Sequence, residues 1–197
     1  MVPSTVSRMP RRSVTVRVAA TLAALTLGAS LAACADTTRI PPAPTDTGAA
    51  EPLFASDEEA LAAAVAAYEE YLEASRLATE TGGSDVGQLE VLTTPEQFQR
   101  EEETLQLYRD GSLRTEGAST LRSTELQQWF DAGEYTTVIF YGCLDISELV
   151  VLGADGEVIE GDDRQDLLPL EISTQHSSDR ELARVASSEV WSGDQRC

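Results

Sequence analysis

Residues 135–144 read YTTVIFYGCL and form the strongest strand pattern in the chain. It is rich in β-branched and aromatic residues, which favour strands. Past Val138 it is apolar on both faces, so we expect a central strand that is covered on both sides. Weaker strand patterns and turn residues surround it. The further strands expected are residues 118–129, 149–152, 167–175 and 180–191.

The half of the domain that precedes these strands reads as helical. Ser56 and Glu59 form a capping box, and apolar residues then recur at helical spacing until about residue 80, before Gly82 and Gly83. A short helix is expected at residues 86–92. A third helix should begin at Thr94 and Pro95 and end at Gly111. Helices followed by antiparallel strands predict an α+β fold.

Histidine and charge limit the chemistry that the chain can perform. The sequence of 197 residues holds 14 Arg and Lys, 34 Asp and Glu and one His, a formal charge of −20. This balance argues against nucleic-acid binding, which needs a basic surface. The one histidine, His176, falls in a polar stretch at 176–179 that predicts a hairpin loop, so we do not expect it to act as a base. No nucleotide, redox or zinc motif is present, and neither a cofactor nor a metal is expected.

The first 33 residues predict export. Four arginines and no acid lie in residues 1–17, and an apolar run of about sixteen residues follows, which is short for a membrane span. Leu31-Ala32-Ala33-Cys34 resembles the lipobox of bacterial lipoproteins. The resemblance implies acylation of Cys34 with palmitate-type chains after removal of residues 1–33. An ordinary signal peptide with an accidental cysteine is the alternative.

The rest of the chain divides into a tether and one domain. Residues 34–52 are rich in Pro, Thr and Ala, which is typical of an extended linker. Residues 53–197 have the size of a single domain. Removal of four arginines leaves a mature charge of −20 − 4 = −24. The mature protein is therefore predicted to stand off the extracytoplasmic face of the cell membrane, held by its lipid.

Three cysteines are an odd number for an exported protein. If Cys34 carries lipid, Cys143 and Cys197 remain, and an oxidising compartment favours a bridge between them. Two free thiols or an intermolecular bridge are the alternatives at this point.

The order of elements resembles the NTF2-like cone fold, and in particular small secreted lipoproteins of high-GC Gram-positive bacteria with that fold. The residues that carry the likeness are YGCLDIS at 141–147 and WSGDQRC at 191–197. The resemblance implies that Cys143 pairs with Cys197 and that N-terminal helices pack on a strongly curved antiparallel sheet. It implies no catalytic residue, because this family has no settled activity.

A cone of this kind can hold a small apolar molecule at its open end. The side chains that we expect to line such a cavity are Val65, Tyr68, Val138 and Phe140. Asp145 and Tyr141 are the candidates for acid–base chemistry, since they share one face of a strand. The plainer interpretation of Asp145 is that it ends the strand and caps a turn. The acidic stretch at 154–166 is interpreted as a solvated loop, with weak Ca²⁺ binding as the alternative.

Three functions are compatible with these features. The leading hypothesis is a non-enzymatic, lipid-anchored module that binds a small ligand or an envelope protein. The second is a small-molecule isomerase or lyase that uses Asp145 with a cavity tyrosine. The third is a purely structural envelope protein whose acidic surface keeps it soluble.

Overall fold

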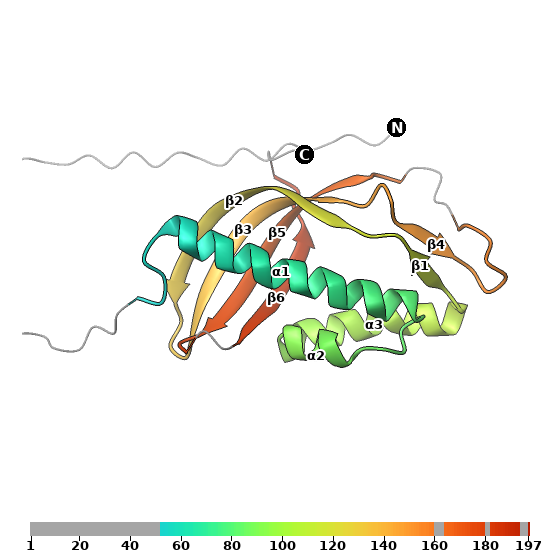
Figure 1. The fold of residues 1–197 in the computed structure, drawn as a ribbon, viewed down its shortest axis with the longest axis horizontal. Helices are drawn as coiled ribbons and strands as arrows, with labels where there is room; N and C mark the ends of the chain where they lie inside the picture. The colour runs from blue at the N-terminus through green and yellow to red at the C-terminus, as the bar shows by residue number, and fades with distance from the viewer. Residues whose placement is uncertain (1–51, 160–163, 180–181, 194–196) are drawn as a thin grey trace, which may run out of the picture. The chain divides into compact units, whose positions relative to one another are not determined.

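The elements of the domain follow the predicted order, helices first and an antiparallel sheet afterwards (Figure 1). The computed structural model describes residues 52–159, 164–179, 182–193 and 197. The predicted signal peptide, Cys34 and the tether up to residue 51 lie outside the described residues. The elements are α1 (Asp57–Glu80), α2 (Gly87–Leu92), α3 (Pro95–Gly111), β1 (Arg114–Glu116), β2 (Thr120–Asp131), β3 (Tyr135–Asp145), β4 (Val150–Leu152), β5 (Leu167–Ser177) and β6 (Ala183–Val190). The predicted α+β class is confirmed.

Local capping signals set the starts of the two long helices. The hydroxyl of Ser56 accepts a hydrogen bond from the N–H of Glu59 at 3.2 Å, and the Glu59 carboxylate accepts one from the N–H of Ala55 at 2.7 Å. At α3, the Thr94 hydroxyl accepts from the N–H of Gln97 at 3.3 Å. Within the described ranges, no helix is both long and apolar enough to cross a bilayer.

The main sheet has four strands in the order β2-β3-β5-β6, and all neighbours are antiparallel. The predicted central strand is therefore confirmed, because β3 pairs with β2 on one side and with β5 on the other. Strands β1 and β4 form a separate two-stranded ribbon. The sequence did not predict β1, whose three residues are held by pairing with β4 rather than by any pattern of their own.

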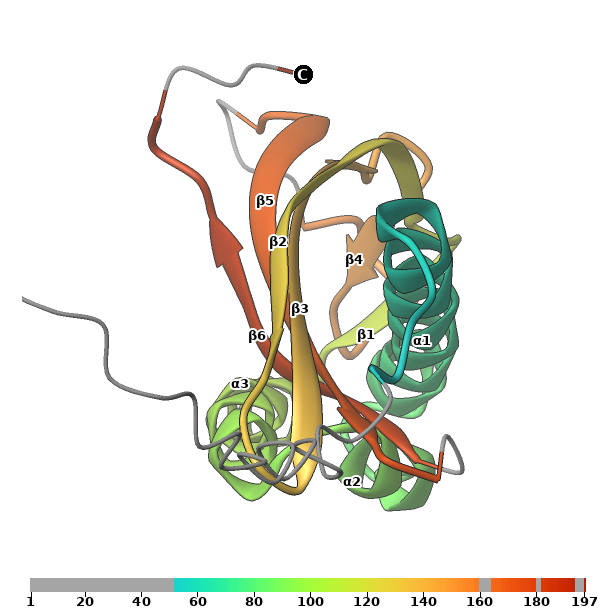
Figure 2. The same cartoon turned by 90° about the vertical axis from the view of Figure 1, so that its left-hand side faces the viewer.

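The strands of the main sheet bend and twist strongly (Figure 2). The pairing of β2 with β3 shifts register twice, between Arg122 and Glu125 and between Leu126 and Gln128. Such bulges kink a strand and increase its twist. The structure is thus compatible with a curved sheet that wraps toward helices.

Helix α1 packs on one face of this sheet, which we call the inner face and which carries Val138, Phe140 and Ile172. The buried side of α1 is mostly alanine, so the helix can approach the strands closely. Tyr68 and Tyr71 are the exceptions, and the ring of Tyr68 meets Phe140 edge-on, with centroids 6.3 Å apart. The other buried residues of α1 are Ala60, Ala64, Ala67, Ala74 and Ala78.

The prediction of a loop around His176 is wrong. Strand β5 continues through Ser177, and His176 pairs with Ala183 and is only 6% exposed. Its Nε2 lies 2.9 Å from the Thr174 hydroxyl, and its ring meets Phe54 edge-on. The polar residues after Gln175 looked like a turn, but alternation along β5 carries His176 to the inner face, where its polar atom is satisfied.

Gly117 is the position where a side chain would be tolerated least. Its φ is +94°, and a Cβ there would lie 2.0 Å from the Glu148 carbonyl oxygen. Gly133 has a similar φ of +85° but nothing within 4 Å of the corresponding Cβ. We expect Gly133→Ala to lower the free energy of unfolding by about 1 kcal/mol. Gly117→Ala should lower it by about 3 kcal/mol because a backbone clash is added. Urea unfolding measures both, and equal losses would contradict the close approach.

The buried imidazole makes stability depend on pH near neutrality. Burial lowers the pKa of His176 below its ordinary 6.5. The unfolded chain then binds a proton at a higher pH than the folded chain, so stability is full above about pH 6.5 and falls as the pH drops below it. Since this is the one His in the chain, His176→Gln should flatten the change in thermal unfolding temperature between pH 7.5 and 5.5. An unchanged slope in the variant would show that the imidazole is not the group responsible.

Candidate functional site

Asp145 ends β3 and is committed to a turn. One carboxylate oxygen accepts hydrogen bonds from the N–H of Ser147 at 3.0 Å and from its hydroxyl at 2.7 Å. The other oxygen lies 2.9 Å from a guanidinium nitrogen of Arg122. The Ser147 hydrogen bonds, followed by the Arg122 charge, lower the pKa of Asp145. A general base that must hold a proton near neutral pH needs the opposite shift.

Tyr141 lies on the opposite side of the sheet from α1, which we call the outer face. It shares this face with Asp145 and Cys143, as the alternation of β3 predicts. Its ring packs on Trp191 at a centroid distance of 4.9 Å, and its hydroxyl accepts a hydrogen bond from Gln127. Partial burial and the neighbouring Glu171 raise the pKa of Tyr141. The phenol is therefore held by neighbours on the outer face.

The residues proposed for a cone cavity lie in the packed core. Val138 and Phe140 are fully buried, Tyr68 is 1% exposed, and Val65 is partly buried beside them. None of these four side chains lines the hollow beside the disulfide, the groove between α1 and α2, or the hollow between α1 and β2. A ligand site formed by them stays a prediction.

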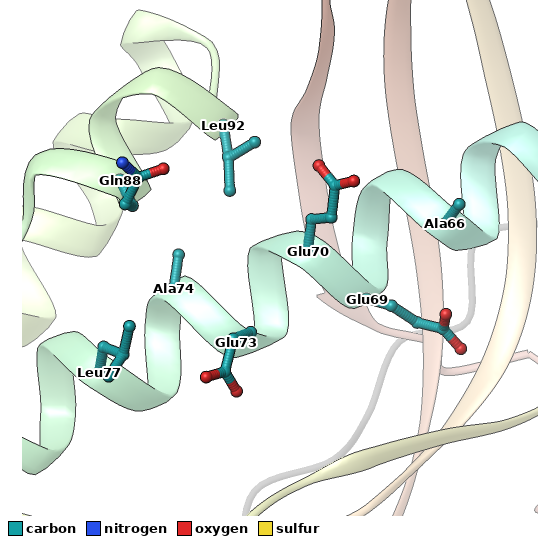
Figure 3. Close-up of a pocket in the computed structure, with 8 residues that line it drawn as sticks. All are labelled: Ala66, Glu69, Glu70, Glu73, Ala74, Leu77, Gln88 and Leu92. Atoms are coloured by element: carbon teal, nitrogen blue, oxygen red, sulfur yellow. The ribbon is translucent and has the colours of Figure 1, made fainter.

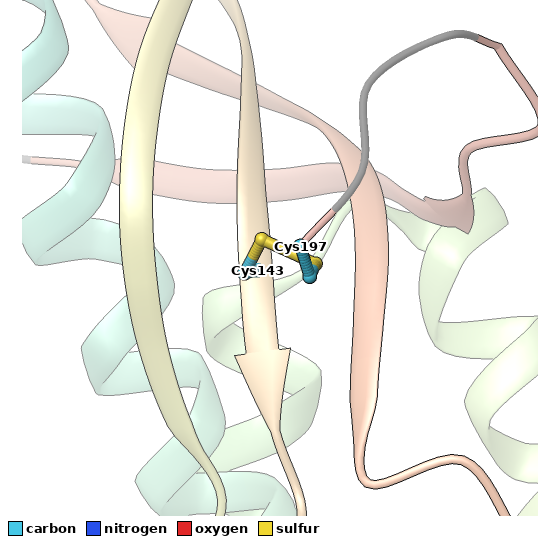
Figure 4. The surroundings of a disulfide bond; sticks show 2 residues. All are labelled: Cys143 and Cys197. Atoms are coloured by element: carbon cyan, nitrogen blue, oxygen red, sulfur yellow. A yellow bond between two sulfur atoms is a disulfide. The ribbon is translucent and has the colours of Figure 1, made fainter.

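Cys143 and Cys197 form a disulfide on the outer face, with their Cα atoms 5.5 Å apart (Figure 4). The bridge joins the middle of the sheet to a residue 54 positions further along the chain. A shallow hollow of about 320 Å³ lies beside it, and Asp145 and Arg122 contribute to its wall. Within the described part of the chain, no group of three or more His, Cys, Asp or Glu side chains is placed to hold a metal ion.

A polar network that sequence patterns did not reveal connects α1 to α3. The Tyr71 hydroxyl donates to Glu101 at 2.6 Å, and the Gln97 amide donates to the same carboxylate oxygen at 2.6 Å. Burial and the Glu101 charge raise the pKa of Tyr71, and burial raises that of Tyr68 to about 12. Both phenols stay protonated, so they serve as hydrogen-bond donors. In the sequence, the one hint of this network is Gln97, a polar residue that interrupts the apolar side of α3; its burial is seen only in the structure.

An open groove between α1 and α2 combines apolar lining residues with charged ones (Figure 3). Its volume is about 600 Å³. Glu70 projects toward α2 and Leu92, whereas Glu69 and Glu73 project from the other edge of α1. The lining residues are Ala66, Glu69, Glu70, Glu73, Ala74, Leu77, Gln88 and Leu92.

Glu69 and Glu73 also border a second hollow, of about 320 Å³, between α1 and the start of β2. There Arg76 holds the Glu73 carboxylate, at 2.5 Å, and that of Glu80, also at 2.5 Å. No ion pair of Glu69 or Glu70 is found among the described residues. The groove thus presents carboxylates that the neighbouring arginine does not neutralise.

Comparison with known proteins adds no assignment to this geometry. The sequence matches no protein-family model, and no curated protein is significantly similar to it.

The disulfide should contribute strongly to stability. In the chain-entropy model, closing a loop of this length stabilises the folded state by roughly 4 kcal/mol. We expect the double variant Cys143→Ser/Cys197→Ser to lose about that much free energy of unfolding in urea. Thiol alkylation of the mature wild-type protein should label neither residue before reduction and both after it. Labelling of both cysteines without reductant would contradict the bridge.

Proposed function

We propose that the chain is an exported lipoprotein, anchored by Cys34 at the extracytoplasmic face of the cell membrane, whose domain is a non-enzymatic binding module. The lipobox-like LAAC at 31–34, the arginines before it and the tether after it support the anchor. We further propose that the curved sheet and its helices belong to the NTF2-like cone family. The disulfide between Cys143 and Cys197 is in keeping with that family.

The groove between α1 and α2 is the observation that carries the binding function. It is open, it has an apolar floor, and Glu70 points into it. Ligand sites in proteins characteristically combine mostly apolar walls with a few polar groups that orient the ligand. We therefore place the binding site in this groove rather than in the interior of the cone, where Tyr68, Val138 and Phe140 pack tightly.

The isomerase or lyase alternative has little support. It needs a carboxylate with a raised pKa beside a phenol in a dry cavity. Asp145 has a lowered pKa and caps a turn, and the buried phenols of Tyr68 and Tyr71 come from α1 on the inner face. A binding role requires none of these shifts.

The test is site-specific photo-crosslinking of the full chain in living cells. A photoreactive residue at position 66, in the groove, should give a discrete adduct in the membrane fraction. The same residue at position 107, which is exposed on α3, should not give that adduct. Metabolic labelling with an alkyne analogue of palmitate should mark the wild-type chain, and Cys34→Ser should abolish the label.

Two results would contradict this proposal. A wild-type chain without the palmitate label, or a Cys34→Ser chain that keeps it, would exclude the lipid anchor. Identical adducts from positions 66 and 107, or none from either, would exclude the groove as the binding site.

A further inference from the structure

We propose that the groove between α1 and α2 receives a cationic, amphipathic helical segment of a second protein. This inference rests on the proposed binding function and names the class of partner that the site fits. The argument depends on the shape of the groove, on its uncompensated charge and on the energetic penalty for covering carboxylates.

The shape suits a helix. The lining residues of α1 recur from Ala66 to Leu77 at helical spacing and so form a continuous strip. At 1.5 Å per residue this strip is about 16 Å long, close to three helical turns. Leu92 of α2 forms the opposite wall. An amphipathic helix that lies in such a groove places apolar side chains on the floor and polar ones at the rim.

The charge selects a cationic partner. Helix α1 carries seven acidic residues and one base, Arg76, which is already occupied by Glu73 and Glu80. An anionic occupant, or a neutral one without hydrogen-bond donors, would remove water from Glu70 without replacing its hydrogen bonds, which is strongly unfavourable. A lysine or arginine side chain of an occupant would instead pair with Glu70, which points into the groove. The mature formal charge, −20 − 4 = −24, would also attract such a partner over distance.

A small polycation would interact with the carboxylates of the groove but not with its apolar side chains. It could pair with Glu70, but it would leave exposed Ala66 and half-buried Leu77 and Leu92 in contact with water. Burial of apolar surface is the main source of affinity in interfaces of this kind. Spermine, which is cationic but has no apolar face, therefore serves as a test of the alternative.

The experiment measures binding of a fluorescent helical Leu/Lys peptide to the mature lipidated chain in neutral phosphatidylcholine nanodiscs, with empty nanodiscs subtracted. We expect binding that weakens as salt is raised, because the ion pairs are exposed. The matching Leu/Glu peptide should not bind, and spermine should bind much more weakly than the Leu/Lys peptide.

Two variants localise the site, each with a matched control. Glu70→Gln removes the carboxylate that points into the groove, and we expect the Kd to rise about three- to tenfold. Ala66→Arg places a cation at an exposed helical position of the floor and should abolish binding. Glu134→Gln and Leu107→Arg make the same charge changes at exposed positions elsewhere and should leave the Kd within about twofold.

Any of three outcomes would overturn the inference. They are no binding of the Leu/Lys peptide at low salt, equal weakening by the groove variants and their controls, and binding of spermine as tight as that of the peptide. If any of these occurs while the adduct at position 66 persists in cells, the partner class is wrong and the binding module stands. Loss of the adduct as well would remove both proposals.

Discussion

The close packing of α1 on the inner face of the sheet is the constraint on which the rest of the structure depends. Ala60 and Ala64 let the helix approach the strands, and Tyr68 anchors it against Phe140. With every apolar residue of this side committed to the core, the acidic residues of α1 are left on its exposed side. One helix therefore builds the core with one face and a wall of the charged groove with the other.

Groups with catalytic potential are used for structure in this domain. Asp145 caps the turn after β3 and pairs with Arg122, while the phenol of Tyr71 donates to Glu101 and so links α1 to α3. His176 is buried and bonded to Thr174. The lowered pKa of Asp145 follows from its contacts with Ser147 and Arg122, and the raised pKa of Tyr71 follows from burial and from Glu101.

The outer face of the sheet is organised by the disulfide. Cys197 is tied to Cys143, and the nearby Trp191 packs on Tyr141, so that two aromatic rings cover a face that α1 does not reach. Gly193 lies against the indole, where a Cβ would come within 2.4 Å of ring atoms. Trp191 and Cys197, which follow β6, are thus held to the sheet by the aromatic contact, by a hydrogen bond from the Trp191 N–H to the Pro169 carbonyl and by the disulfide.

Structural features that depend only on residues close together in the chain were predictable from the sequence. Ser56 and Thr94 start their helices, YTTVIFYGCL forms the central strand, and the alternation of β3 places Tyr141 and Asp145 on one face. Which face of the sheet helix α1 covers depends on tertiary packing and was not predictable in this way. For the same reason, only the structure shows that Tyr141 lies outside the core and that His176 lies within it. The groove depends in the same way on where α2 returns against α1. Periodicity specifies which side chains lie together on an element, but the partner of each face is chosen by packing between segments far apart in the chain.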